Sequence, residues 1–118
     1  MKTFRGVKDE LTVKSTATFQ DNYGKSESVD VTLTYKKIND IDKVKDLLKS
    51  ISKMASNEVE IIGKHLVSWD LTYDDGDQVP LDPETLAAVW QIAPYRKVLS
   101  ELFLRVQLDA KAVEEKNS

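Results

Sequence analysis

Three residue types of a hydrolytic triad occur close together in this chain, at His65, Ser68 and Asp70. The surrounding residues have the pattern of a β-strand, whose side chains alternate between the two faces of a sheet. His65 and Ser68 would then point in opposite directions and would not form the nucleophile–base pair that hydrolysis requires. We interpret His65 instead as a polar residue at a strand edge or partly inside the core.

Acidic residues gather at 73–77 (YDDGD), where a cation site is conceivable. If Gly76 took the place of the invariant glycine of an EF-hand loop, Leu71 and Tyr73 would occupy positions that require carboxylates. The EF-hand motif therefore fails. A weak cation site made by the clustered aspartates is one alternative, and the turn preferences of Asp and Gly favour the other, an acidic turn.

The chain lacks most of the residue types on which catalysis and metal binding depend. It has no cysteine and a single histidine, which excludes thiol nucleophiles, cysteine-based zinc sites and histidine-rich metal sites. Its four glycines are isolated, so the sequence contains no glycine-rich phosphate loop. We therefore expect a protein that is not an enzyme, carries no cofactor or metal, and acts by binding or assembly.

Charge and hydropathy exclude two further kinds of partner. The net charge is −3, whereas nucleic-acid binding needs a basic surface. No apolar run approaches the roughly 18–20 residues of a membrane-spanning helix. The first ten residues lack the apolar stretch of a secretory signal. The sequence therefore predicts a cytoplasmic protein that binds neither nucleic acid nor membranes.

The first half of the chain predicts a hairpin followed by a helix. Apolar and polar residues alternate over 11–20 and 27–36, which is typical of half-buried strands, and a turn with Asn and Gly lies between them. Apolar residues then recur every three or four positions over 39–56, as in an amphipathic helix. We expect Asn39 to cap this helix and the helix to pack on the hairpin.

The segment 59–73 is rich in residues that favour β-structure, and we place a strand at 65–73. Gly63 is expected to break the piece that precedes this strand. Strict alternation along the strand puts four large side chains on one face. These are Val67, Trp69, Leu71 and Tyr73.

The last third of the chain predicts two helices. Asp82 at the N-cap and Pro83 at the first helical position specify a helix start. Leu81 and Leu86 are spaced to pack on each other as a hydrophobic staple around that start. Pro94 interrupts the helix, because proline lacks the backbone donor and clashes with the preceding turn. A second helix is expected to follow.

These elements predict a single α+β domain that covers residues 1–118. Its order is an N-terminal antiparallel β-hairpin, an amphipathic helix, a further strand and two C-terminal helices. Residues 1–10 are expected to form a loose arm and residues 110–118 a disordered tail, because both segments are polar and lack an apolar period.

The two C-terminal helices hold more large apolar residues than one buried stripe needs. We expect some to stay exposed and bind a partner, because exposed apolar patches mark interaction sites. The candidates for this partner surface are Trp90, Tyr95, Leu102 and Phe103. For the two tryptophans, packing in the core is the alternative.

The charges of the chain are unevenly distributed. Residues 1–59 hold 11 Lys and Arg against 9 Asp and Glu, whereas residues 60–118 hold 6 against 11. This asymmetry predicts head-to-tail self-association between oppositely charged halves. A surface on which these charges only face water is the alternative.

Several turn and helix-cap motifs follow one another in the second half: VSWDL (67–71), DG (75–76), VPLDPE (79–84), Pro94, Tyr95 and Val98. Together with the preceding hairpin and helix, this order resembles the tail assembly chaperones of long-tailed, siphovirus-type bacteriophages and prophages. The specific part of the resemblance covers about residues 66–103, and the first half matches only in the type of its elements. These motifs are structural, so the resemblance transfers no catalytic residue.

The resemblance implies a protein that binds the tape measure protein, a long helical chain, and also the tail tube protein, before tube subunits assemble around it. Such a protein works in the host cytoplasm and is not part of the mature virion. A second, longer product made by ribosomal frameshifting is also implied. Glu115-Lys116-Asn117 permits codons with a run of adenines where a ribosome can slip.

Two other classes of function are compatible with the sequence. One is a small adaptor of another system that uses the same α+β scaffold to bind a different protein. The other is a small enzyme, which the scarcity of catalytic residue types disfavours. Dependence on ATP or a metal would favour the enzyme, and co-purification with a long helical protein would favour the chaperone.

Overall fold

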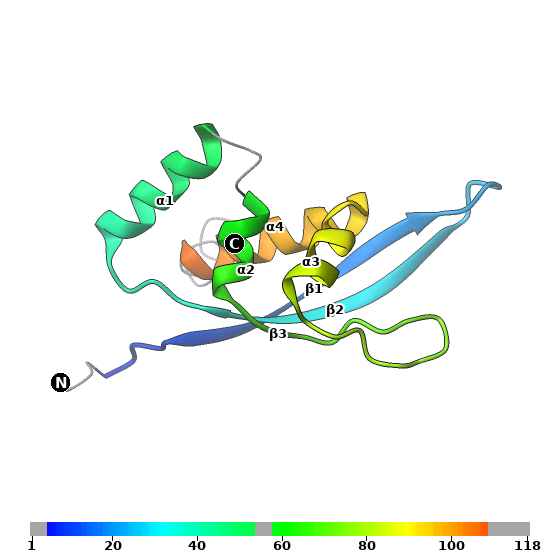
Figure 1. Ribbon diagram of the computed structural model, residues 1–118, viewed down its shortest axis with the longest axis horizontal. Helices are drawn as coiled ribbons and strands as arrows, with labels where there is room; N and C mark the ends of the chain where they lie inside the picture. The colour runs from blue at the N-terminus through cyan, green and yellow to red at the C-terminus, as the bar shows by residue number, and fades with distance from the viewer. Residues whose placement is uncertain (1–4, 54–57, 109–118) are drawn as a thin grey trace, which may run out of the picture.

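The computed structural model describes residues 5–53 and 58–108, which form an α+β fold (Figure 1). Within these ranges a three-stranded antiparallel sheet, in the order β1-β2-β3, is accompanied by four helices. The elements are β1 (Glu10–Gln20), β2 (Ser26–Lys36), α1 (Ile41–Lys53), α2 (Glu58–His65), β3 (Leu66–Trp69), α3 (Pro83–Trp90) and α4 (Ala93–Gln107).

The hairpin of β1 and β2 confirms the predicted strands 11–20 and 27–36 to within one residue at each end. Its register runs without a break from the Glu10–Lys36 pair to the Gln20–Ser26 pair. Alternate residues are buried on one face, and the other face is polar, as expected of an antiparallel sheet with one solvated side. The buried side chains of the hairpin are Val13, Ala17, Val31, Leu33 and Tyr35.

Helix α4 covers the buried face of the hairpin. The ring of Tyr35 meets Phe103 edge-on with 5.3 Å between centroids, and the Tyr35 hydroxyl donates a hydrogen bond of 2.9 Å to the Leu99 carbonyl. Burial of this hydroxyl raises the pKa of Tyr35 far above its ordinary value, so the group stays a donor. The prediction that the helix at 39–56 packs on the hairpin is therefore wrong, because the larger apolar side chains of α4 fill that place.

Helix α1 stands apart from the sheet in Figure 1. Among its described side chains Leu47 packs against the main core and stays half-buried. Its cap is Asp40, whose carboxylate accepts hydrogen bonds from the backbone N–H groups of Asp42 and Lys43. Asn39, which we expected to cap the helix, instead donates to the Lys8 carbonyl. The predicted end of the helix near 56 lies outside the described residues.

The C-terminal end of α4 is held against the end of β2. The buried Gln107 amide accepts a hydrogen bond from the Ile38 N–H and donates one to the Lys36 carbonyl, at 2.9 and 2.7 Å. The Lys37 ammonium donates to the Val106 carbonyl at 3.0 Å. A positive charge at a helix C-terminus is favourable, so these contacts fix α4 over the sheet.

Residues 59–62 belong to a helix, and the prediction of a β-rich segment there is wrong. In α2, Glu60 lies in the first turn and Lys64 in the last, which complements the helix dipole. Ile62 is buried in the core. Burial on one side of a helix overrides the β-propensity of this segment. Gly63 was predicted to break the β-rich piece before the strand, but it lies inside the helix.

The prediction of a long strand at 65–73 is wrong. The strand β3 has only four residues, Leu66–Trp69, and contains a β-bulge. Tyr35 of β2 pairs with Leu66, whereas the neighbouring Thr34 pairs with Ser68, so Val67 is an extra residue in β3. The extra residue breaks the expected alternation, which puts Leu66 and Trp69 in the core and leaves Val67 exposed. The prediction that four residues share one face is therefore wrong: Trp69 and Leu71 are buried, but Val67 and Tyr73 are not.

The predicted boundaries of the last two helices are confirmed. The Asp82 side chain accepts a hydrogen bond of 2.8 Å from the Thr85 N–H, and Pro83 is the first residue of α3. Helix α3 ends at Trp90, and Pro94 lies in the first turn of α4. Of the loose arm expected at 1–10, residues 1–4 lie outside the described residues, as does the whole tail expected at 110–118.

Candidate binding groove

Of the three polar residues with triad chemistry, His65 and Asp70 are held in structural hydrogen bonds. His65 is the last residue of α2, where its Nδ1 lies 2.8 Å from the Ile61 carbonyl oxygen, which can only accept. The imidazole ring packs edge-on against Phe103, at 5.5 Å between centroids. The Asp70 carboxylate accepts a hydrogen bond of 2.8 Å from the Thr32 N–H. His65 and Asp70 therefore tie α2 and the end of β3 to their neighbours.

The acidic run at 73–77 forms the predicted turn. Gly76 has a φ of +91°, which favours glycine, and its N–H donates to the Tyr73 carbonyl at 2.9 Å. The Asp75 carboxylate accepts a hydrogen bond from the Asp77 N–H at 2.9 Å. Within residues 5–53 and 58–108, no group of His, Asp or Glu side chains is arranged to hold a metal ion.

Most of the residues predicted to form an exposed partner surface lie in the core. The prediction that these side chains are exposed is therefore wrong. Trp90, Leu102 and Phe103 are buried, and Tyr95 is half-buried with its ring 5.1 Å from Phe19. The excess of apolar residues in α4 has another cause. This helix packs against the sheet on one side and against α2 and α3 on the other, so it needs more than one apolar stripe.

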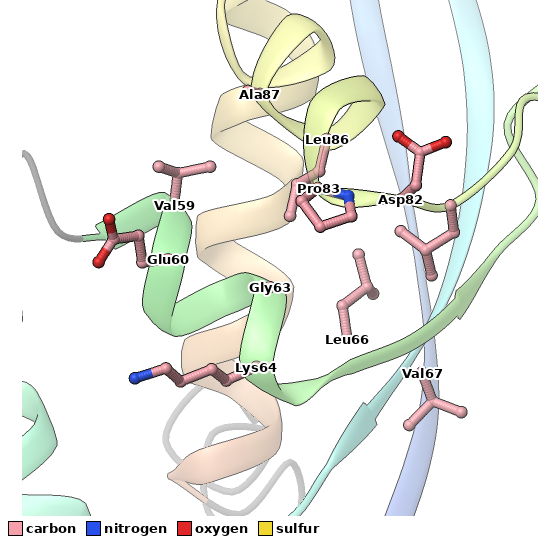
Figure 2. Close-up of a pocket in the computed structure, with 11 residues that line it drawn as sticks. Val59, Glu60, Gly63, Lys64, Leu66, Val67, Asp82, Pro83, Leu86 and Ala87 are labelled. Carbon is pink, nitrogen blue, oxygen red and sulfur yellow. The ribbon is translucent and has the colours of Figure 1, made fainter.

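An open groove of about 710 Å³ lies instead between α2, β3 and the start of α3 (Figure 2). In Figure 2, Val59 and Gly63 come from α2, Leu86 and Ala87 from α3, and Leu66 from the start of β3. Most of the lining is aliphatic. The full lining consists of Val59, Glu60, Gly63, Lys64, Leu66, Val67, Leu81, Asp82, Pro83, Leu86 and Ala87.

Gly63 sets how closely the two walls of the groove approach. A Cβ atom at this position would lie 3.1 Å from Cδ2 of Leu86, which is tighter than ordinary van der Waals contact. Without that atom, α2 closes directly onto Leu86, which is buried and forms part of the groove lining. The helices therefore touch at Gly63, while the surface beside this contact stays hollow.

Two apolar residues on the other side of the groove remain open to solvent. The bulge in β3 turns Val67 outward, with 39% of its surface exposed. Leu81 precedes the Asp82 cap and is 36% exposed. The spacing of Leu81 and Leu86 predicts a hydrophobic staple, and in the structure both side chains line the groove.

A second hollow of about 310 Å³ continues the groove along β3 and shares Val67 and Leu81 with it. Its lining includes the buried Trp69, whose indole N–H donates a hydrogen bond of 2.8 Å to the Val79 carbonyl. The predicted core role of Trp69 is confirmed. Its hydrogen bond fixes the segment around Val79 beside β3, and the two hollows adjoin at Val67 and Leu81.

Charged residues of both signs border the groove. Glu60 and Lys64 lie one turn apart on α2, and Asp82 lies at the start of α3 (Figure 2). Hydrogen bonding from Thr85 lowers the pKa of Asp82, so this carboxylate keeps its negative charge at neutral pH. In Figure 2 the Glu60 and Lys64 side chains extend from α2 away from Leu66 and Pro83, so these charges lie at the outer edge of the groove.

Comparison with known proteins gives no match to this chain among family models, curated proteins or solved structures. No helix in the described part of the chain is long and apolar enough to cross a membrane. The groove itself is thus the observation from which a function can be argued.

Proposed function

We propose that this chain is a non-enzymatic tail assembly chaperone of a long-tailed bacteriophage or prophage. In this proposal it binds the tape measure protein, and also the tail tube protein, in the host cytoplasm and does not remain in the mature virion. The motifs at 67–71 and 79–84 support the assignment through their resemblance to that family. The groove supports it through the chemistry of its lining.

The single observation that carries the proposal is an apolar groove that stays open between α2, β3 and the start of α3. Exposed aliphatic residues such as Val67 and Leu81 cost free energy in water unless a partner covers them. An amphipathic helix fits such a groove by inserting side chains that recur every three or four residues. A long helical client offers this pattern repeatedly, and the charged border limits the depth to which it enters.

Co-expression with the tape measure protein of the same genome tests the proposal. The chain is expected to increase the soluble fraction of that protein and to be retained by it in a pull-down. Leu81→Glu places a charge in the groove and should weaken retention by more than about tenfold, as at an interface hot spot. Ile92→Glu is the matched control, because Ile92 is similarly exposed, at 42%, but does not line the groove.

Equal retention of the Leu81→Glu and Ile92→Glu variants would remove the groove as the client site. If the wild-type chain neither retained nor solubilised the tape measure protein, the chaperone function itself would be wrong. Retention of an unrelated protein through Leu81 in its place would point to the adaptor.

The proposed longer product is tested at the level of the gene. A slippery run requires adenine-rich codons at 115–117 and an open −1 frame that continues beyond Ser118. If Lys116 is encoded by AAG, or if that frame is closed, no frameshift of this kind occurs. The chaperone proposal does not depend on this outcome.

A further inference from the structure

Strand β1 forms one edge of the sheet, because the strands lie in the order β1-β2-β3 (Figure 1). At the two ends of its register with β2, the Asp21 N–H donates to the Lys25 carbonyl and the Lys37 N–H donates to the Asp9 carbonyl. In an antiparallel ladder, residues that exchange such hydrogen bonds alternate with residues that do not. The odd-numbered residues of β1 therefore bond to β2, and the even-numbered residues direct their N–H and C=O groups to the outer edge.

This outer edge lacks most of the features that keep edge strands apart. Strand β1 has 11 residues, about twice the usual length of a strand. It contains no proline, and its register with β2 has no bulge. The Arg105 guanidinium reaches the edge and donates a hydrogen bond of 3.3 Å to the outward Lys14 carbonyl, on the exposed surface. A long and regular edge of this kind offers its backbone groups to another strand.

The sequence of β1 is complementary to itself when two copies run antiparallel about Ser15. The opposed residues are then Glu10 with Gln20, Leu11 with Phe19, Thr12 with Thr18, Val13 with Ala17, and Lys14 with Thr16. Apolar residues face apolar residues, and no like charges are opposed within the strand. The next register in one direction opposes Lys14 to Lys14, and the next in the other direction leaves Glu10 and Leu11 unpaired. The register about Ser15 is thus the one that uses the whole edge.

Pairing in this register also covers apolar surface. Leu11 and Phe19 pack against the core of their own chain but stay half-buried. Each faces the other across the two strands, and pairs of aromatic and aliphatic side chains stabilise neighbouring strands. The side chains at both ends of the edge therefore favour a second copy of the same strand.

From these observations we infer that the outer edge of β1 is a docking surface for β1 of a second copy. Two copies pair antiparallel about a two-fold axis at Ser15, which joins their three-stranded sheets into one. The contact is isologous and closes after two copies, unlike the head-to-tail contact predicted from the charges of the two halves. Arg105 leaves the Lys14 carbonyl when the strands meet, because the Thr16 N–H of the second copy takes its place.

Charge makes this pair reversible and gives it a distinct response to salt. The chain has a net charge of −3, so two copies repel each other. Asp9 of one copy also lies close to Asp21 of the other, just beyond the paired residues. Salt screens such repulsion, so association through β1 should strengthen as ionic strength rises. A head-to-tail contact between unlike charges should weaken under the same change.

The pair leaves both binding grooves open. The groove lies beside β3, at the opposite edge of the sheet from β1. Two paired copies therefore present two grooves on opposite sides of the two-fold axis. This consequence rests on the proposed function: a long helical client can enter both grooves, and the second contact gains from a raised effective concentration.

Disulfide formation tests the contact directly, because the chain contains no cysteine. Ser15 faces Ser15 of the second copy as a non-hydrogen-bonded pair, whose Cα atoms lie about 4.5 Å apart, within reach of a disulfide. With glutathione disulfide as oxidant, Ser15→Cys should form linked pairs about tenfold faster than Ser28→Cys. Ser28 is the matched control because it is an exposed serine of β2, away from the edge. Equal rates would overturn the inference.

A mixture of two variants tests the register. Thr12→Cys should link to Thr18→Cys, which it faces, and should not link to itself, because two copies of Thr12 lie at opposite ends of the paired edge. If Thr12→Cys linked to itself as fast as to Thr18→Cys, the register about Ser15 would be wrong.

Sedimentation at low and high salt provides a measurement that needs no cysteine. The wild-type chain should pass from monomer to dimer as its concentration rises, more readily at high salt. Thr16→Pro removes an outward N–H, which an edge strand tolerates, and circular dichroism checks that it folds. Because symmetry removes the hydrogen bond twice, the dissociation constant of the dimer should rise about tenfold or more. Thr16→Val keeps the N–H and should dimerise like wild type.

Arg105→Ala should tighten the dimer, because it frees the Lys14 carbonyl; weaker association of this variant would contradict the assigned edge. A wild-type chain that stays monomeric at all concentrations would overturn the inference, as would a folded Thr16→Pro variant that dimerises like wild type. If Thr16→Pro does not fold, the linking rates of Ser15→Cys and Ser28→Cys decide.

Retention of the tape measure protein separates the inference from the proposed function. If wild type is monomeric and Leu81→Glu still weakens retention, only the inference is wrong. If the chain dimerises through β1 but neither retains nor solubilises the tape measure protein, only the proposed function is wrong. Weaker retention by the folded, monomeric Thr16→Pro variant supports both, because the client then has one groove in place of two.

Discussion

Two regions of this molecule that are covered by helices differ in how completely side chains fill them. Between α4 and the hairpin, Tyr35, Leu33 and Leu102 have essentially no contact with solvent. In the groove between α2, β3 and the start of α3, apolar residues such as Val67 and Leu81 remain more than one-third exposed. Aromatic rings line the closed region, whereas the lining of the groove is mostly aliphatic and contains no aromatic residue.

The difference comes from the size of the side chains at the closest approach. Under α4 the Phe103 and Tyr35 rings fill the space between helix and sheet. Between α2 and α3 the closest approach is made at Gly63, which has no side chain to spread into the neighbouring space. A contact made at a glycine lets two helices approach closely, but it places no side chain in the space beside the contact. Close packing thus stabilises one region, whereas a hollow remains in the other.

Phe103→Ala should produce the largest effect of the substitutions considered, because it opens a cavity in the closed region. Large-to-small changes at buried aromatic residues cost about 3–5 kcal/mol of unfolding free energy. Urea unfolding followed by circular dichroism measures this loss. A loss below about 1 kcal/mol would show that the α4 interface is not the main core.

Leu47→Ala in α1 should cost less, because Leu47 is half-buried at the margin of the core. A fully buried leucine would lose about 2–5 kcal/mol, so we expect about 1–2 kcal/mol here. The same urea titration gives the value. A loss as large as that of Phe103→Ala would mean that α1 contributes to the core as much as α4 does.

The stability supplied by the Asp82 cap should depend on pH. Because hydrogen bonding from Thr85 lowers the pKa of Asp82 in the folded chain, its contribution is present above the ordinary aspartate pKa. It is lost as the pH falls below about 4 towards the lower folded value. Asp82→Asn keeps a cap without titrating, so the difference in stability between wild type and this variant should shrink on acidification. A difference that grows as the pH falls would contradict the assigned role.

The hairpin was predictable because its information is local. Strict alternation over 11–20 and 27–36 and a turn of five residues determine its register without reference to the rest of the chain. The Asp82-Pro83 start of α3 is local in the same way, since cap and first helical residue are adjacent. Such elements can be read from neighbouring residues alone.

The groove was not predictable because it depends on contacts between distant residues. The segment at 59–62 has β-forming side chains, and its helix is stabilised by burial of Ile62 against the core. The exposure of Val67 follows from one extra residue in β3, which the pairing with β2 reveals. The isolated Gly63 within an apolar segment was the one available signal, because a close approach of backbone elements often needs glycine.

Gly63→Ala is expected to give the smallest change in stability. It is also the sharpest test of the comparison between the two regions. Alanine favours a helix interior over glycine by about 0.5–1 kcal/mol. The new Cβ, 3.1 Å from Leu86 Cδ2, opposes this gain by displacing Leu86. The two effects nearly cancel, so unfolding free energy should change by less than about 1 kcal/mol. Retention of the proposed client, the tape measure protein, should nevertheless fall, because the displaced Leu86 narrows the groove.

Gly76→Ala is the matched control for this substitution. Gly76 has open space for a Cβ but a φ of +91°, so its replacement strains the backbone of the turn without touching the groove. We expect Gly76→Ala to lower stability by about 1 kcal/mol and to leave client retention unchanged. If Gly63→Ala weakened stability and retention in parallel, Gly63 would be a packing residue only. If it left both unchanged, the approach of α2 to Leu86 would not set the width of the groove.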